Sequence, residues 1–246
     1  MIRQFVSDPR SSIATKWNAF REGLFDPDRF FEDRVGKYGI TYEFIFVLFI
    51  GAIGAAAMYF ASQQLLQPFD TGALMGPDDV NGGEPIASDS TRQVRAYPVQ
   101  LLVGMFVIWF YYTTTFHLGS WFYAGRGTYF ATLKHTAWGF LPYLVGQIVF
   151  ALGVVVTFWL LEVETDLPGR AERDVAYLYG QGLDEPIMIV ASVLLMASIV
   201  WCGYVWTYAL SKAQELERSE TIKIVAIPVA LHIGFLLYDL LGRTVL

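Results

Sequence analysis

The chain has almost no cysteine: among its 246 residues, Cys202 is the only one. A disulfide within the chain and a zinc cage built from thiolates are therefore excluded. The sequence has no His-Glu-x-x-His pair, no Gly-x-Ser-x-Gly turn and no phosphate-binding Gly-rich loop, the patterns of metalloproteases, serine hydrolases and nucleotide-binding enzymes. Its Ser, His and Asp residues show no spacing that indicates a triad. We therefore expect a protein that is not an enzyme, with no catalytic residue, metal or cofactor.

The N-terminal segment, residues 1–41, lacks the apolar core of a signal peptide and carries charges throughout. We therefore expect it to belong to the mature protein, with the first apolar run as the insertion signal.

Hydrophobic residues are abundant and make up 54% of the chain. They gather in five runs, at residues 42–64, 98–123, 137–161, 186–210 and 222–241. Each run meets the length of roughly 20 residues that a helix needs to cross a bilayer. A spanning segment must satisfy its own backbone hydrogen bonds, which predicts helices. The fold class is therefore an all-α membrane protein, with a cytoplasmic amphipathic N-terminal segment (1–41) that holds a short helix and a transmembrane domain (42–246) of five helices.

The positive charges are unevenly distributed between the two sides that five spans define. Twelve of the 17 Lys and Arg residues lie in residues 1–41, in the second and fourth connections, or, in the case of Lys223, at the adjoining start of the fifth run, whereas acidic residues gather in the first and third connections. The positive-inside rule places the N-terminus in the cytoplasm and the C-terminus outside. We expect a multi-pass protein of the cell membrane, and the acidic outer connections favour a prokaryotic one.

A stripe of apolar residues in the N-terminal segment recurs at helical spacing beside basic residues, and Pro27 should end this helix. Two roles remain open: contact with lipid headgroups or a partner, and packing against the inner end of the bundle. The candidate interface residues of this segment and of the second connection are Trp17, Phe20, Arg21, Phe30, Phe31, Arg126 and Lys134. Membrane lipids, a membrane or cytoplasmic protein, or a second copy are the expected partners, and nucleic acid is not.

Small residues and prolines predict how the spans pack and bend. Gly51 and Ala55 are four apart in the first span, so we expect a close-packed face inside the bundle. Pro98 and Pro186 should open the second and fourth spans. Pro142 and Pro228 should lie inside the third and fifth spans and bend them.

Few polar side chains lie at membrane depth, and such residues are candidates for function. They are His117, Gln147, His232 and Asp239. Since His232 and Asp239 are two helical turns apart, one metal ion cannot bind both without distortion. We expect hydrogen bonds between helices from these residues in preference to a metal site or a proton relay.

The order of several short motifs resembles the Yip1-domain family, in particular its prokaryotic members. The motifs are Leu-Phe-Asp-Pro-Asp-Arg-Phe-Phe at 24–31, a Gly-rich basic stretch at 125–133 and Ala-Trp-Gly-Phe-Leu-Pro-Tyr-Leu at 137–144. The last motif along the chain is a Trp-bearing fourth span that leads into a short helix (201–213) and then into the fifth span (221–237). The resemblance implies five membrane helices and a cytoplasmic N-terminus.

Eukaryotic members of that family bind Rab-type GTPases, and their cytoplasmic region has an Asp-Leu-Tyr-Gly-Pro motif that the N-terminus here lacks. The expected function is therefore a membrane scaffold, adaptor or membrane-organising protein. The alternative is a transporter or channel component, with a polar path near His117 and His232.

Overall fold

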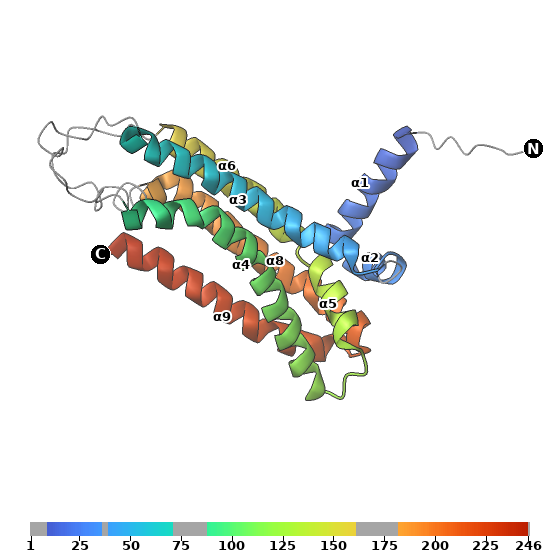
Figure 1. Cartoon of the computed structure of the whole chain (residues 1–246). Coiled ribbons are helices and arrows are strands. Elements are labelled where there is room, and N and C mark those ends of the chain that lie inside the picture. The colour runs from blue at the N-terminus through green and yellow to red at the C-terminus, as the bar shows by residue number, and fades with distance from the viewer. Residues whose placement is uncertain (1–8, 36–38, 71–87, 161–181, 246) are drawn as a thin grey trace, which may run out of the picture. The chain divides into compact units, whose positions relative to one another are not determined.

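The structure of the protein is a computed structural model that describes residues 9–35, 39–70, 88–160 and 182–245 (Figure 1). All regular secondary structure in these ranges is helical. The long helices are α3 (Thr41–Asp70), α4 (Ser88–Trp121), α6 (Leu141–Leu160), α8 (Pro186–Gln214) and α9 (Arg218–Val245). Each is long and apolar enough to cross a membrane, which confirms the predicted all-α class with five spanning helices.

Three shorter helices accompany them: α1 (Pro9–Phe25), α2 (Pro27–Asp33) and α5 (Tyr129–Trp138). The first two occupy the predicted amphipathic segment, and Pro27 begins α2 where the preceding helix was expected to end. Residues 71–87 of the first predicted outer connection and residues 162–181 of the third lie outside the described residues. Residues 88–96, also predicted to belong to the first connection, instead form the start of α4.

The prediction that the third span begins at residue 137 is wrong. The chain leaves the helix at Gly139, the C-cap of α5, and starts α6 at Leu141. Gly139 lies directly against the indole of Trp206, where a β-carbon would collide with the ring. Pro142 therefore stands in the first turn of α6, where its missing N–H has no helical partner to lose, and it bends no helix.

The other proline predictions have mixed outcomes. Pro186 opens α8 and Pro228 lies inside α9, as predicted. Pro98, expected at the start of the second span, lies inside α4 because that helix already begins at Ser88.

The described chain divides into two compact units. Unit 1 comprises Met1–Phe46, Trp109–Tyr143 and Ile199–Ala230, and unit 2 comprises Val47–Ile108, Leu144–Ser198 and Leu231–Leu246. Each of the five long helices therefore contributes residues to both units.

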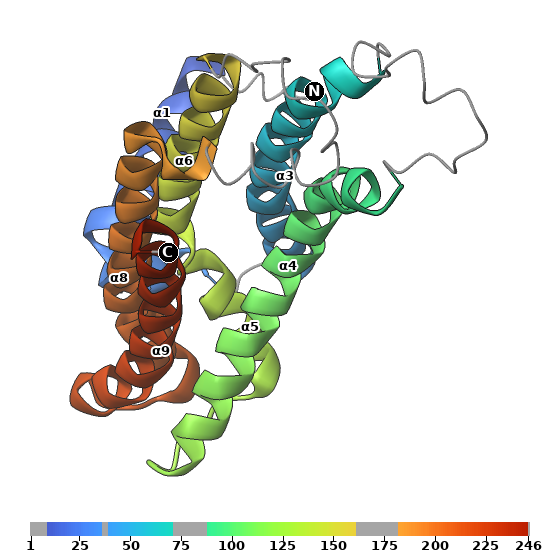
Figure 2. The same cartoon turned by 90° about the vertical axis from the view of Figure 1, so that its left-hand side faces the viewer.

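Small residues bring the helices of unit 2 together, as predicted for the first span. Gly51 of α3 lies against Leu102 and Met105 of α4. On α6, Gly146 meets Ser198 and Gly153 meets Ala191, so α6 and α8 run side by side in opposite directions (Figure 2). One buried hydrophobic cluster of this unit is formed by Ala57, Met58, Ala61, Ala151, Val154, Phe158 and Met188.

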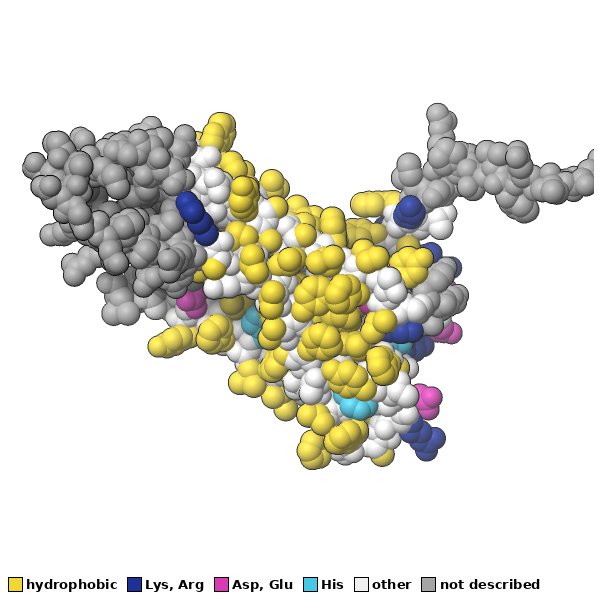
Figure 3. All heavy atoms as spheres, viewed as in Figure 1, with side chains coloured by type: hydrophobic (Ala, Val, Ile, Leu, Met, Phe, Trp, Pro, Cys, Tyr) yellow, Lys and Arg dark blue, Asp and Glu magenta, His cyan; other side chains and the backbone are white. Residues whose placement is uncertain are grey.

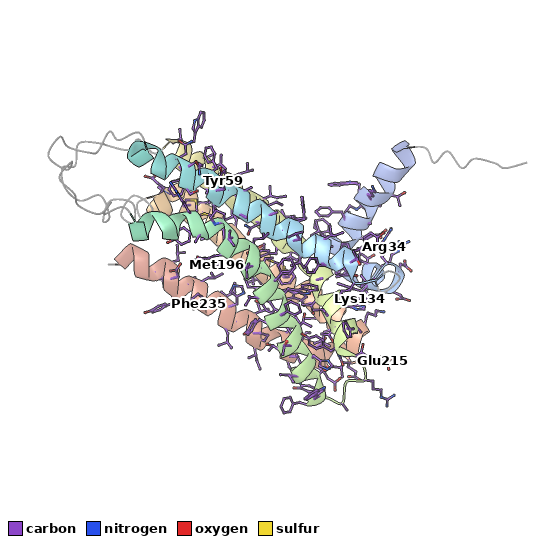
Figure 4. The ribbon with its side chains drawn as sticks, in the orientation of Figure 1. Arg34, Tyr59, Lys134, Met196, Glu215 and Phe235 are labelled. Atoms are coloured by element: carbon purple, nitrogen blue, oxygen red, sulfur yellow. The ribbon has the colours of Figure 1, made fainter. Side chains whose placement is uncertain are left out.

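Large apolar side chains are exposed on every long helix, and hydrophobic atoms cover much of the face drawn in Figure 3. Tyr59 and Phe235, labelled in Figure 4, are 60% and 70% exposed. So many exposed apolar residues are unusual in water but expected where hydrocarbon is the solvent.

Candidate functional site

Four tryptophan indoles tie the elements of unit 1 together. The Trp201 N–H donates to the carbonyl of Leu24 (3.2 Å), at the end of α1. The N–H of Trp206 donates to the carbonyl of Thr136 (3.0 Å) and that of Trp109 to the carbonyl of Leu133 (3.0 Å), both on α5. Carbonyls in the last turn of a helix lack helical partners. The indoles of α8 therefore cap two helix ends, and this fixes α1 and α5 in place.

The fourth indole, that of Trp138, donates to the Glu43 carboxylate (N–H to Oε1, 3.1 Å). Glu43 is 2% exposed, and its Oε2 has no hydrogen-bond partner within the described part of the chain. Its position in the first turn of α3 places the carboxylate at the positive end of the helix dipole. Sequence analysis missed this residue, because it lies at the edge of an apolar run and its partner is 95 residues away.

The helix α2 is anchored in unit 1 by two phenylalanines. Phe30 and Phe31 are 5% and 2% exposed and pack on the rings of Trp138 and His135. Of the two roles left open for this pair, the structure favours packing within the protein, because both rings are already covered by other residues of unit 1. An amphipathic pattern shows that an apolar face is buried, but it does not distinguish lipid from protein as the covering.

Charged residues add to this attachment. The Lys212 ammonium lies 3.3 Å from the Asp28 carboxylate and 3.1 Å from that of Glu32, which joins α8 to α2. The Arg34 guanidinium bonds the Glu22 carboxylate at 2.8 Å, which joins the chain after α2 to α1.

The helix α1 carries three of the other predicted interface residues, Trp17, Phe20 and Arg21. The last turn of α1 packs on the protein, with Leu24 buried and Gly23 against Leu141. Towards the N-terminus the helix extends away from α2 and α5 (Figure 1). Trp17 is 63% exposed and stacks on Phe20, and Arg21 is exposed beside them.

Gln214, the last residue of α8, is the centre of a polar junction in unit 1 and is 0% exposed. Its Nε2 lies 3.0 Å from His117 Nδ1 on α4 and 2.6 Å from Thr132 Oγ1 on α5. Its Oε1 accepts the backbone N–H of Gly127 (3.1 Å), and its carbonyl accepts that of Arg126 (3.0 Å). The amide therefore joins α4, the turn before α5, α5 itself and α8. Sequence analysis did not identify it.

The predicted basic residues of the second connection lie beside this junction. Arg126 is exposed in the turn that Gln214 holds, and Lys134 is partly exposed on α5 (Figure 4).

The four predicted intramembrane residues divide between the units. His117 belongs to unit 1 and bonds Gln214, which agrees with the expected hydrogen bonding between helices. Gln147, His232 and Asp239 belong to unit 2. There Gln147 is 7% exposed and lies against Gly54 of α3, His232 is partly buried and Asp239 is exposed. Within the described residues, no three His, Cys, Asp or Glu side chains form a cluster able to hold a metal ion.

The burial of His135 on α5 leads us to expect that the stability of the protein depends on pH. Burial lowers the pKa of His135 below its usual value of 6.5; the positive charge of Lys134 acts in the same direction, and the bond to the Ala131 carbonyl opposes it. In the unfolded chain His135 takes up a proton near pH 6.5, whereas in the folded chain it does so only at lower pH. The stability that comes from keeping His135 neutral is therefore fully present above about pH 6.5, and it is lost as the pH falls towards the lower pKa of the folded state.

We expect the thermal unfolding midpoint in detergent micelles to fall between about pH 7 and about pH 5, the range where histidine titrates. His135→Asn should show a smaller fall than the wild type. An undiminished fall in this variant would contradict the assignment.

A family model, the Yip1 domain, matches residues 22–238, which cover most of the chain. Comparisons with curated proteins and with solved structures gave no match. The matched range includes the end of α1, all of α2 and α5, the first four predicted spans and the fifth up to residue 238, so it contains the tryptophan caps and the Gln214 junction. The chain therefore belongs to the Yip1-domain family, and its five apolar helices make it a multi-pass membrane protein.

Proposed function

We propose that the protein is a non-catalytic membrane scaffold or adaptor, and that α1 is the segment with which it holds an acidic protein partner. The observation that carries this proposal is the difference between the packed end and the exposed middle of α1. Its last turn is fixed by Trp201 and Leu141, whereas residues 14–18 are exposed. In proteins most of the stability of a helix comes from packing one of its faces on a surface, and the exposed part of α1 (Pro9–Phe25) lacks such a surface within the described residues.

The side chains that α1 presents fit such a partner. Lys16 and Arg21 are exposed on either side of Trp17. Tryptophan and arginine are the residues most often responsible for binding energy in protein interfaces. Two cations beside an exposed indole favour a surface that offers carboxylates around an apolar pocket.

The distribution of charge supports a location in the cell membrane with α1 in the cytoplasm. Twelve of the 17 Lys and Arg residues, those of α1 and α2 among them, belong to segments that the positive-inside rule assigns to the inner side. On this orientation α1, Arg126 and Lys134 all face the cytoplasm, and the C-terminus lies outside.

A non-catalytic role is supported by the way unit 1 uses its polar groups. Gln214 bonds both His117 and Thr132, and the indole of Trp138 donates to one oxygen of Glu43. These contacts hold helices together, and a site for a reacting substrate is not needed to explain them.

A photo-crosslinking amino acid at Asn18, an exposed position on α1, tests the proposal in native membranes. We expect a defined protein adduct, whose yield falls about tenfold or more when Trp17→Ser and Arg21→Glu are combined, because such a pair removes a central aromatic contact and reverses a charge.

The matched control is Trp159→Ser, which removes a tryptophan from α6 that is somewhat more exposed (72%) than Trp17. This variant should leave the adduct unchanged. If Asn18 yields only lipid adducts, or if the double variant retains the wild-type yield, α1 is not the docking segment and the adaptor role is rejected.

A further inference from the structure

The hydrogen positions in the Gln214 junction follow from its partners. The backbone N–H of Gly127 can only donate, so the atom of Gln214 that it meets at 3.1 Å must be the amide oxygen. The NH₂ group of Gln214 therefore faces His117 and Thr132. The Thr132 hydroxyl donates to the carbonyl of Thr128 (3.2 Å), so its oxygen is available to accept from Gln214.

This arrangement determines the state of His117. The NH₂ group donates, so the Nδ1 atom of His117, 3.0 Å away, must accept with its lone pair. The ring proton is then on Nε2, and the imidazole is neutral. An imidazolium carries hydrogen on both nitrogens, and its Nδ1–H would point at the NH₂ group of Gln214.

Among the described residues, none of those that contact His117 offers a charged group that would replace this partner. On its own helix it meets the ring of Trp121 edge-on (5.6 Å), and on α5 the ring of Tyr129 (5.4 Å). The Tyr129 hydroxyl is bonded to Thr114, and α8 presents the uncharged Gln214. On α9 the Lys223 ammonium lies over the ring of Tyr123. His117 is partly exposed, so protons can reach it.

We propose that His117 is a proton-binding site that couples pH to the junction between α8 and the turn at residues 125–128. Protonation of His117 at Nδ1 places its N–H donor opposite the NH₂ donor of Gln214, so the Gln214 amide must turn away. This movement breaks the bond from Gly127 N–H to Oε1, and it loosens the neighbouring bond from Arg126 N–H to the Gln214 carbonyl. The turn that presents Arg126 is therefore held at neutral pH and released in acid.

Hydrogen exchange of the Arg126 and Gly127 amides, measured by NMR on the full-length protein in detergent micelles, tests the proposal. Exchange is compared at about pH 7.5 and about pH 5.5, the range in which histidine side chains change charge, after correction for the intrinsic pH dependence of exchange. We expect protection of both amides to fall about tenfold or more on acidification, the factor that corresponds to one lost hydrogen bond.

Two variants separate the protonation of His117 from other effects of acid on the protection of these amides. His117→Asn keeps an acceptor close to the position of Nδ1 but does not titrate, so both amides should stay protected at either pH. Gln214→Glu offers two acceptor oxygens that suit an Nδ1–H donor, so acidification should not reduce protection in this variant.

The control is His135→Asn, which removes another titrating histidine of unit 1 and should keep the wild-type response at Arg126 and Gly127. The proposal is overturned if the wild type shows equal protection at both pH values. It is also overturned if His117→Asn or Gln214→Glu loses protection in acid as the wild type does.

Discussion

Replacing Gly127 with alanine is expected to lower the free energy of unfolding by about 3 kcal/mol or more, at the upper end of what overpacking costs. A β-carbon at Gly127 would lie on the carbonyl oxygen of Ala213 and 3.0 Å from the Cα of Gln214. Both obstacles are backbone atoms of α8, which cannot rotate aside as a flexible side chain does. The turn must therefore move away from α8, and the bond from Gly127 N–H to Gln214 Oε1 is lost with it.

The measurement is equilibrium unfolding in mixed detergent micelles, with Gly104→Ala as the matched control. Gly104 lies within α4 and has open space where its β-carbon would be, so alanine should leave stability unchanged or raise it by up to about 1 kcal/mol. A Gly127→Ala protein as stable as the wild type would mean that the turn does not rest on α8.

The number of spanning helices could be predicted because hydrocarbon thickness selects helix length. Apolar runs as long as those of α3 and α8 have no other stable arrangement in a bilayer. The start of the third span could not be predicted in this way. Residues 137–144 read as one apolar run, and the break at Gly139 depends on Trp206, which is far away in the sequence.

The candidate site was predicted less completely, because its contacts also join residues that are far apart in the sequence. His117 could be identified because an ionisable residue at membrane depth is unusual. Its partner Gln214 is a neutral residue in a stretch with Lys212 and Glu215, which reads as an exposed end of a helix. The bond joins residues 97 apart, and no local pattern of hydrophobicity or charge indicates such a pairing.

Trp206→Ala is expected to destabilise the protein by about 3–5 kcal/mol, the usual cost of truncating a buried aromatic residue to alanine. Trp206 is 1% exposed, and its ring centroid lies 4.3 Å from that of Tyr112, 4.9 Å from Phe140 and 5.5 Å from Phe116. Truncation leaves a cavity among these rings. It also removes the donor to the Thr136 carbonyl, which then has no partner at the end of α5.

Two further substitutions divide this loss into its parts when all are measured by the same unfolding method. Trp206→Phe keeps most of the aromatic packing but removes the N–H, so it should cost about 1–3 kcal/mol, the penalty for a buried acceptor without a donor. Trp159→Ala removes a tryptophan that is 72% exposed and bonds none of the described elements through its indole, so the change should stay within about 0.5 kcal/mol. If Trp206→Ala were as mild as Trp159→Ala, the indole would not hold α5 to α8, and the assignment of the tryptophans as helix caps would be wrong.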